Sequence, residues 1–250
     1  MLPEKAAHLH TAQALLRASA IMATVAPRNP TMTIRAFAFD LDGTLVDSIA
    51  DLARAANAAR ADLGLPPLAE EVVQGFVGDG AASLVARTLA GEHDANWHGT
   101  PQQQQAMERF DVHYKAGLTI ATRFYPEVQE TLHSLHELEY PLAIVTNKPE
   151  RYTLPLLREL GISERFDVIV AGDTLAEKKP SPLPLQHVLD KLGLAPAQLL
   201  MVGDSKNDVL AAKAAGAPSV LVSYGYGQDV HEMGADHVIR FFSEVLEFID

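Results

Sequence analysis

The sequence predicts an α/β protein with a doubly wound, parallel-sheet core and an inserted α-helical domain. Short, almost wholly apolar runs alternate with helical patterns along much of the chain, as is typical of parallel strands covered by helices on both faces. One interval breaks this alternation, because about 100 positions separate Asp40 from Leu142, far more than one crossover helix needs. We therefore expect an insertion after the first strand.

The apolar runs predict strands at Ile34–Phe39, Leu142–Val145, Val168–Ala171, Leu199–Val202 and Val220–Val222. Glycine is favoured just after a helix because it adopts the left-handed conformation without strain. This rule predicts helices at Leu154–Leu160 before Gly161, Leu183–Leu192 before Gly193, and Asp208–Ala215 before Gly216. Ser181 and Pro182 are suited to be the N-cap and first residue of the second helix.

The insertion is expected to be a mostly helical cap domain at residues 51–123, with a core domain at 32–50 and 124–250. Its first helix is indicated by apolar residues on one helical face before Gly64, namely Leu52, Ala55, Ala56, Ala59 and Leu63. The chain is expected to return to the sheet near Phe124.

Residues 1–31 are alanine-rich and precede the first strand. We expect a flexible extension, or a start assigned upstream of a true start at Met32. A secretion signal is the weaker alternative, because the apolar run around Ile21 and Met22 is short and is interrupted by Ser19 and Thr24.

Charge and composition limit the partners. The chain has 20 lysines and arginines against 32 acidic residues, a net charge of −12, which disfavours nucleic acid and anionic membranes. It has no cysteine, which excludes disulfides and thiolate zinc sites. No apolar run reaches the length of a membrane-spanning helix. We expect a cytoplasmic protein, either a monomer or a homodimer.

Polar residues follow four of the predicted strands. In an open parallel sheet, ligands bind at the carboxyl ends of the strands. The residues at these ends are Asp40 and Asp42, then Thr146 and Asn147, then Lys178 and Lys179, then Asp204 and Asp208. Clustered carboxylates repel one another, and a hard divalent cation is the usual compensation. Mg²⁺ fits best, because it leaves coordination positions for water and for a substrate phosphate.

Four ordered motifs, "DLDGTLVDS", "VTNKP", "KKP" and "GDSKND", resemble the haloacid dehalogenase superfamily of phosphohydrolases over Ile34–Asp236. The resemblance implies a Rossmann-like core and places the insertion where that superfamily has an α-helical cap. The segments "VTNKP", "KKPSPLPL" and "VGDSKNDVLAAKAAGAPSVLVSYGYG" are similar to bacterial phosphoglycolate phosphatases. This similarity implies a small phosphorylated carboxylic acid as substrate, 2-phosphoglycolate above all.

The resemblance also implies roles for the first two strand ends. Asp40 would be the nucleophile that forms an aspartyl-phosphate, and Asp42 would be the general acid and base. The backbone carbonyl of Asp42 would be a metal ligand beside Asp40. Thr146 would donate a hydrogen bond to a phosphoryl oxygen, helped by the backbone N–H groups of Asn147 and Gly43.

At the other two strand ends, the resemblance implies that Lys179 offsets the charge of the nucleophile and the phosphate. Lys178 stays open as the alternative. Asp204 would complete the magnesium site, and Asp208 would orient Lys179 or a metal-bound water.

Outside the core motifs, Gly78, Asp79 and Gly80 are expected to form a cap loop that contacts the substrate. Four cations in or near the cap could meet the substrate carboxylate: Arg87, which is nearest to this loop and is favoured, then Arg109, Lys115 and Arg123. Asp47 is expected to cap or flank the exit toward the cap. Residues 224–227 are expected to form a surface turn.

Several rival functions share these motifs. A dehalogenase would not need Asp42. A phosphonate hydrolase would need a Schiff-base lysine in the cap, and Lys115 is not placed as expected. A phosphate-binding or partner-binding module without catalysis would lack a core residue, and none is missing. A phosphatase or phosphomutase for a sugar phosphate, such as N-acetylmuramic acid 6-phosphate, stays open because only the cap would discriminate it.

Overall fold

The computed structural model describes residues 33–93 and 99–249, which belong to one compact unit. Its main sheet is six-stranded and parallel, in the order β5-β4-β1-β6-β7-β8. The strands are β1 Ala36–Phe39, β4 Leu142–Val145, β5 Val168–Val170, β6 Leu199–Gly203, β7 Ser219–Val222 and β8 His237–Ile239. The predicted α/β fold class is confirmed, all five predicted strands are present, and β8 is an additional edge strand. The predictions for residues 1–31 lie outside the described residues.

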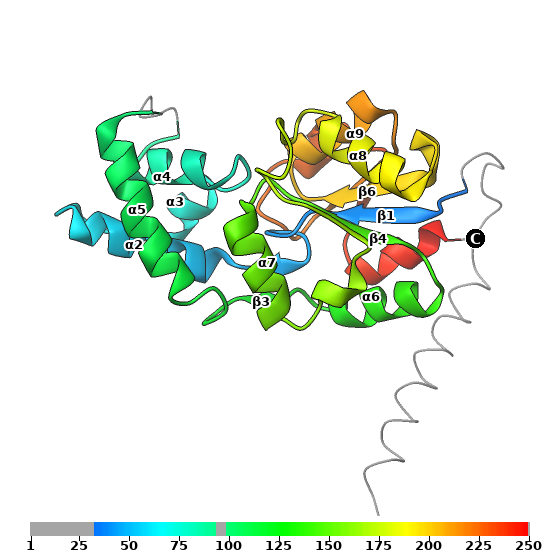
Figure 1. The fold of residues 1–250 in the computed structure, drawn as a ribbon, viewed down its shortest axis with the longest axis horizontal. Helices are drawn as coiled ribbons and strands as arrows, with labels where there is room; N and C mark the ends of the chain where they lie inside the picture. Colours follow the sequence, from blue (N-terminus) through cyan, green and yellow to red (C-terminus); the bar gives the residue numbers. More distant parts are fainter. Residues whose placement is uncertain (1–32, 94–98, 250) are drawn as a thin grey trace, which may run out of the picture. The chain divides into compact units, whose positions relative to one another are not determined.

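The two faces of the sheet differ in side-chain size, as the alternation in β1 requires. Phe37 and Phe39 pack on one face with residues of α6 (Val128–Glu137), α7 (Glu150–Glu159) and the 3₁₀ helix η4 (Phe242–Phe248). Ala36 and Ala38 lie on the other face, against α8 (Leu183–Leu192) and α9 (Lys206–Ala215). Figure 1 shows these two helical layers above and below the strands.

The helix boundaries shift slightly from the predicted ones. α8 has the predicted bounds, but α7 begins at Glu150 and α9 at Lys206, because their first turns are polar and give no apolar signal. Pro182 is the N-cap of α8 and not its first residue. Ser181 Oγ accepts from the backbone N–H of Leu183 at 3.2 Å. Short 3₁₀ helices complete this part: η1 Ser163–Arg165, η2 Pro196–Gln198 and η3 Val230–Glu232.

Among the described residues, four helices lie between β1 and residue 123, where the chain returns toward the sheet: α2 Ile49–Asp62, α3 Glu70–Gln74, α4 Ala81–Ala90 and α5 Pro101–Lys115. We call this segment the insert. In α2, Leu52, Ala55, Ala56 and Ala59 are buried, as the helical periodicity predicts. α2 packs against α5, and its alanines permit a close approach of the two helices.

Two short antiparallel strands, β2 (Val46–Asp47) and β3 (Arg123–Phe124), carry the chain into and out of the insert. The buried Asp51 holds this crossing together, because its Oδ2 accepts from the backbone N–H groups of Ala121 and Thr122, each at 2.8 Å. The described residues form one compact unit, so a division into core and cap domains stays a prediction.

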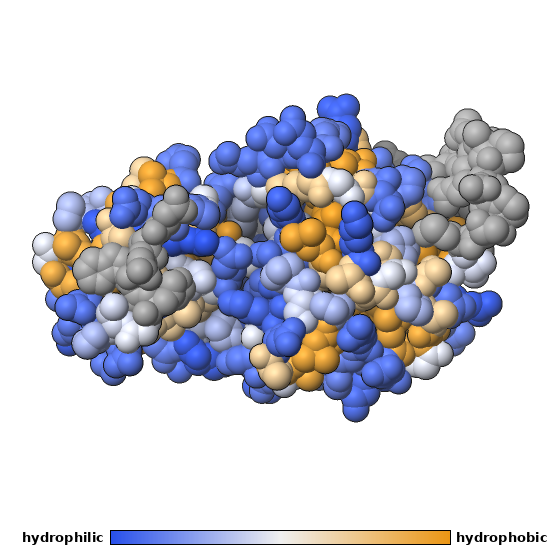
Figure 2. Space-filling view, turned by 90° about the horizontal axis from the view of Figure 1, so that it is seen from above, coloured by the Kyte–Doolittle hydropathy of each residue, from blue (hydrophilic) through white to orange (hydrophobic). Residues whose placement is uncertain are grey.

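Hydrophilic and hydrophobic residues are interspersed on the face in Figure 2, as on globular protein surfaces generally. The large exposed apolar side chains come from different elements, for example Val112 of α5 and Leu210 of α9. Among the described residues, the helices are too short or too polar to cross a membrane.

Candidate active site

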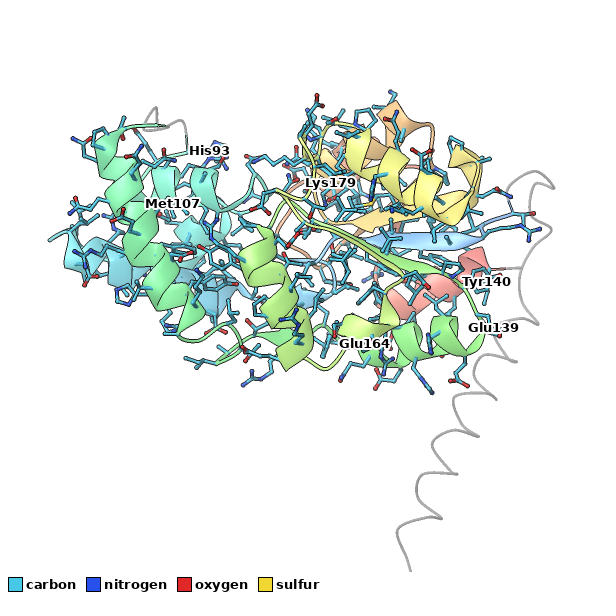
Figure 3. All side chains as sticks on the ribbon, viewed as in Figure 1. His93, Met107, Glu139, Tyr140, Glu164 and Lys179 are labelled. Carbon is cyan, nitrogen blue, oxygen red and sulfur yellow. The ribbon has the colours of Figure 1, made fainter. Side chains whose placement is uncertain are left out.

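Four neighbouring strands bring the predicted site residues to one edge of the sheet. Asp40 follows β1, Thr146 follows β4, Lys179 lies in the loop after β5, and Asp204 follows β6. Figure 3 places Lys179 at the end of the sheet that faces the insert, and Tyr140 at the opposite end. The predicted residues from four separate motifs are therefore close together in the fold.

Lys179 forms the buried centre of the first cluster. Its Nζ lies 3.1 Å from Asp40 Oδ1 and 2.5 Å from Asp208 Oδ1, and the residue is 1% exposed. Lys178 points elsewhere, because its Nζ donates to the backbone carbonyl of Asp79. Lys179, and not Lys178, is therefore the lysine that lies beside Asp40.

Three carboxylates surround this ammonium. Oxygens of Asp40, Asp204 and Asp208 lie within 4.8 Å of one another. When all three carboxylates are ionised, Lys179 compensates one of the three negative charges, and two remain uncompensated in this buried cluster. Burial raises the pKa of Asp40 to about 6, with Lys179 opposing the rise and Asp208 adding to it. The pKa of Asp204 is raised too, by burial and then by the charges of Asp40 and Asp208.

A divalent cation would relieve this imbalance, and the donor set suits a hard one. Asp208 is already occupied, since its Oδ1 accepts from Lys179 and its Oδ2 from Ser205 N and Oγ at 3.0 and 2.7 Å. Asp204 Oδ2 accepts from the backbone N–H of Tyr226 at 2.7 Å. Asp40 and Asp204 are therefore the carboxylates best placed to hold a cation.

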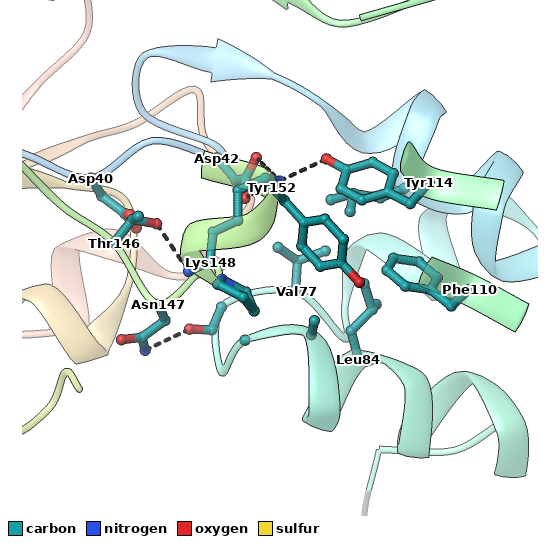
Figure 4. A pocket seen from close by; sticks show the side chains of 15 residues that line it. Asp40, Asp42, Val77, Leu84, Phe110, Tyr114, Thr146, Asn147, Lys148 and Tyr152 are labelled. Atoms are coloured by element: carbon teal, nitrogen blue, oxygen red, sulfur yellow. Dashed lines mark hydrogen bonds and ion pairs between the residues drawn. The ribbon is translucent and has the colours of Figure 1, made fainter. Parts of the chain in front are cut away.

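Asp42 belongs to a second cluster that the sequence analysis missed. Lys148 Nζ lies 3.0 and 2.9 Å from Asp42 Oδ1 and Oδ2, and 2.7 Å from the Tyr114 hydroxyl of α5 (Figure 4). Ser48 Oγ donates to Asp42 Oδ1 at 2.6 Å. Lys148 lies inside the "VTNKP" motif, but no residue spacing in the sequence distinguishes it from a surface lysine. Its partner Tyr114 is 34 positions earlier in the chain, so the sequence does not indicate their contact. The one available signal was the i,i+4 aromatic pair of Phe110 and Tyr114 on the buried face of α5.

Asp40 and Asp42 both line a cavity between the strand ends and the insert. Thr146, Asn147, Lys148, Pro149 and Tyr152 also line it from the core, and Leu52, Val77, Gly78, Gly80, Ala81, Leu84, Phe110 and Tyr114 from the insert (Figure 4). The hydroxyl of Thr146 also hydrogen-bonds Asp40 and accepts from the backbone N–H of Lys148 at 3.2 Å.

Comparison with known proteins is consistent with this arrangement. The family model described as haloacid dehalogenase-like hydrolase matches residues 37–222. The chain belongs to this family.

Curated relatives extend the match along most of the chain. A phosphoglycolate phosphatase of Chromobacterium violaceum is 49% identical over 216 residues, which are 86% of this chain and 96% of that protein. One of Neisseria gonorrhoeae is 47% identical over 83% of this chain and 87% of that protein.

Solved structures show the same fold. A predicted phosphoglycolate phosphatase from Haemophilus somnus superposes with a TM-score of 0.80 and 35% identity, covering 87% of this chain and 98% of that one. CbbY from Rhodobacter sphaeroides, solved in complex with phosphate, gives a TM-score of 0.70 and 29% identity over 87% and 100% of the two chains.

In this member of the haloacid dehalogenase-like family, the loop of residues 78–80 is tied to the core. Asn147 Nδ2 donates to the carbonyls of Gly78 and Lys179, each at 2.9 Å. Asn207 Nδ2 donates to Asp79 Oδ1 at 2.8 Å. Gly78 and Gly80 line the cavity, whereas the Asp79 side chain is directed to Asn207 and Arg87.

The favoured partner for a substrate carboxylate, Arg87, does not line this cavity. Its Nη2 pairs with Asp79 at 2.6 Å, its Nη1 donates to Phe76 O, and its Nε to His93 O. Arg87 does lie near the glycine loop, as predicted, but its guanidinium binds the loop itself through Asp79. The other three candidates are also absent from the cavity wall: Arg109 is exposed, Lys115 pairs with Asp111, and Arg123 bonds to backbone carbonyls.

Two further expectations need correction. The backbone N–H of Gly43 already donates to the Val46 carbonyl at 2.9 Å, so it does not point at a phosphate. Residues 224–227 form a turn, as expected, but this turn is half-buried against the site. A Cβ on Gly225 would overlap Asp204 and the Gly43 carbonyl, so this position requires glycine. Asp47, by contrast, flanks α2 as expected, with its Oδ1 accepting from Ile49 N at 3.3 Å.

Proposed function

We propose that the protein is a Mg²⁺-dependent phosphatase that hydrolyses 2-phosphoglycolate to glycolate and phosphate through an aspartyl-phosphate. The observation that carries this proposal is the pair of Asp40 and Asp42, each held by its own buried lysine in one cavity. Curated relatives that are 41–49% identical over most of the chain carry the name phosphoglycolate phosphatase, which supports the choice of substrate.

In the first half-reaction, a carboxylate oxygen of Asp40 attacks phosphorus and the bond from phosphorus to the glycolate oxygen breaks. Protonated Asp42 gives its proton to that departing oxygen, so that glycolate leaves as the alcohol. Thr146 donates a hydrogen bond to a phosphoryl oxygen, and Lys179 offsets the negative charge of Asp40 and the phosphoryl group. The hydroxyl of Thr146 is close to Asp40, as these roles require.

In the second half-reaction, Asp42 removes a proton from water, and the resulting hydroxide attacks phosphorus. The bond between phosphorus and Asp40 breaks, and phosphate is released with both aspartates restored. Ser48 and Lys148 fix the carboxylate of Asp42 for both proton transfers. One residue thus serves as acid and then as base, as a two-step displacement requires.

The metal ligands in this proposal are the carboxylates of Asp40 and Asp204 and the backbone carbonyl of Asp42. Their oxygen-only chemistry and the excess of buried negative charge fit Mg²⁺. When bound, this ion supplies charge neutralisation for the nucleophile and the phosphoryl oxygens. Asp208 acts by holding Lys179 and is not itself a ligand.

The insert is proposed to act as a cap domain that covers the substrate and excludes water from the aspartyl-phosphate. Its wall of the cavity includes the apolar side chains of Leu52, Val77, Leu84 and Phe110. A sugar phosphate would find few partners for its hydroxyl groups there, which favours a small acid over N-acetylmuramic acid 6-phosphate. The cytoplasmic location and the monomeric or dimeric state stay predictions.

A steady-state comparison tests the substrate directly. We expect kcat/KM for 2-phosphoglycolate to exceed that for hexose phosphates and N-acetylmuramic acid 6-phosphate by at least about tenfold, which corresponds to about 1.4 kcal/mol of transition-state binding. A preference of the same size for any sugar phosphate would overturn the assignment.

A further inference from the structure

Lys148 is the only side chain with a permanent positive charge among the described residues that line the active-site cavity. Lys179 lies behind Asp40 and pairs with two carboxylates. The cations of the insert are directed elsewhere, as described for Arg87 and Lys115. An anionic group that enters the cavity beside the phosphate therefore has one cationic side chain to meet.

The ammonium of Lys148 is held in a fixed position. Its Nζ donates to both carboxylate oxygens of Asp42 and to the hydroxyl of Tyr114, and it lies 4.8 Å from the centre of the Tyr114 ring. Only 4% of the Lys148 side chain is exposed. One hydrogen bond from Lys148 Nζ is enough to keep the ion pair with Asp42. The other N–H group that now donates to Asp42 can therefore donate to a second carboxylate.

The charge of this ammonium is stable. Burial acts to lower the pKa of Lys148, but Asp42 and Tyr114 outweigh burial and raise it. The Tyr114 hydroxyl keeps its proton, since burial raises its pKa to about 12. Lys148 is therefore a cation and Tyr114 a neutral acceptor at any physiological pH.

We propose that Lys148 binds the carboxylate of the substrate and selects phosphate esters that carry this carboxylate one carbon away from the ester oxygen. The inference rests on the proposed function, in which Asp42 contacts the ester oxygen. Because Lys148 Nζ lies within 3.0 Å of both oxygens of Asp42, a group that reaches Lys148 must lie close to that ester oxygen. In 2-phosphoglycolate, a single methylene separates the ester oxygen from the carboxylate carbon, so both contacts can form at once.

Tyr114 connects Lys148 to the insert. The hydroxyl comes from α5 of the insert, whereas Lys148 follows β4 of the core. The cap loop with Gly78 and Gly80 lines the same cavity. The core thus contributes the cation, and the insert contributes the group that positions it.

The test compares 2-phosphoglycolate with 2-phosphoglycolamide, in which a neutral amide of the same shape replaces the carboxylate. A hydrogen bond to a charged group is lost with the amide, so wild-type kcat/KM should be about 10- to 100-fold higher for the acid. Lys148→Met should remove most of this preference, and Lys148→Arg should keep part of it. Lys115→Met removes the same charge from the exposed surface of α5 and should leave the preference within about twofold of wild type.

Equal losses on both substrates in Lys148→Met would overturn the inference, since Lys148 would then act only through Asp42 or through folding. A wild-type enzyme that hydrolyses both compounds equally well would overturn it too. Should Lys148→Met fail to fold by circular dichroism, Lys148→Gln carries the same comparison. Failure of the proposed function is distinct, because it would appear in the wild-type enzyme alone as a preference for sugar phosphates over 2-phosphoglycolate.

Discussion

Lys179 and Lys148 are two buried ammonium groups, each paired with one of the two aspartates that follow β1. Lys179 is enclosed by carboxylates of the core, with Asp40 on one side and Asp208 on the other. Lys148 pairs with Asp42 but also contacts Tyr114 of the insert and faces the cavity. The ammonium of Lys179 is thus enclosed by carboxylates of the core, whereas the ammonium of Lys148 borders the cavity.

This difference separates two tasks. The closed cluster of Lys179 contains the proposed nucleophile and the candidate cation ligands, which hydrolysis of any phosphate monoester would need. The open cluster of Lys148 borders the part of the cavity where substrates differ from one another. We therefore expect changes around Lys179 to affect all substrates alike and changes around Lys148 to affect the choice among them.

The largest effect is expected at the nucleophile. Asp40→Asn keeps the size of the side chain but removes the attacking carboxylate, so kcat should fall by about 10⁴-fold or more on every substrate. Asp47→Asn is the matched control from the same loop, and its kcat should stay within about threefold of wild type. Steady-state kinetics with 2-phosphoglycolate measures both variants. Substantial turnover by Asp40→Asn would remove Asp40 from the role of nucleophile.

The next largest effect is expected in the closed cluster. Lys179→Met leaves Asp40 and Asp208 facing each other without compensation, so kcat should fall by about 10²- to 10³-fold. The free energy of unfolding should fall by about 3–5 kcal/mol in a urea titration. The ratio of kcat/KM between 2-phosphoglycolate and its amide should not change. A loss of that preference would contradict the separation of the two clusters.

A smaller effect is expected on the stability of the fold when Mg²⁺ is added at different pH values. The pKa of Asp40 is about 6 in the folded state, above its ordinary value of 3.8. A raised carboxyl pKa stabilises the metal-free fold below about pH 4, and this contribution is lost as the pH rises through about 6. Mg²⁺ competes with these protons, so its stabilising effect should be larger at about pH 7.5 than at about pH 5.

Thermal unfolding with and without Mg²⁺ at both pH values measures this effect. At a concentration 100 times Kd, stabilisation by a bound ion is about 2.7 kcal/mol. Asp204→Asn lacks one proposed ligand and should show a smaller rise in Tm on addition of Mg²⁺. A rise in Tm that is equal at both pH values, or larger at the lower one, would argue against binding to ionised Asp40.

The smallest effect is expected at Tyr114. Tyr114→Phe removes one acceptor from Lys148 Nζ but keeps the ring, so the preference for 2-phosphoglycolate over its amide should fall by about 3- to 10-fold. In Tyr152→Phe the lost hydroxyl contacts Asp111 at 2.7 Å and not Lys148, so the preference should change by less than about twofold. Equal ratios in the two variants would show that Tyr114 does not position Lys148.

The sequence allowed prediction of the core better than of the cavity, for a physical reason. Strands that are buried on both faces are continuous apolar runs in the sequence. Because the strands are parallel, their carboxyl ends lie at the same end of the sheet for any loop conformation. The edge strand β8, with the exposed His237, lacks such a run and was missed. Lys148 was missed because its role depends on the packing of α5 against the core. Arg87 was predicted to meet the substrate carboxylate because it is close to the glycine loop in sequence. That closeness did not reveal that its guanidinium pairs with Asp79.

Phosphorylation of Asp40 during turnover of 2-phosphoglycolate is the step on which the proposed mechanism depends. The most direct measurement is an acid quench within the first turnovers, followed by borohydride reduction, which converts an aspartyl-phosphate to homoserine, and peptide mass spectrometry. We predict homoserine at position 40 in the wild-type enzyme and at neither position 40 nor 42 without substrate. Homoserine at position 42, or full turnover with neither aspartate modified, would contradict the account.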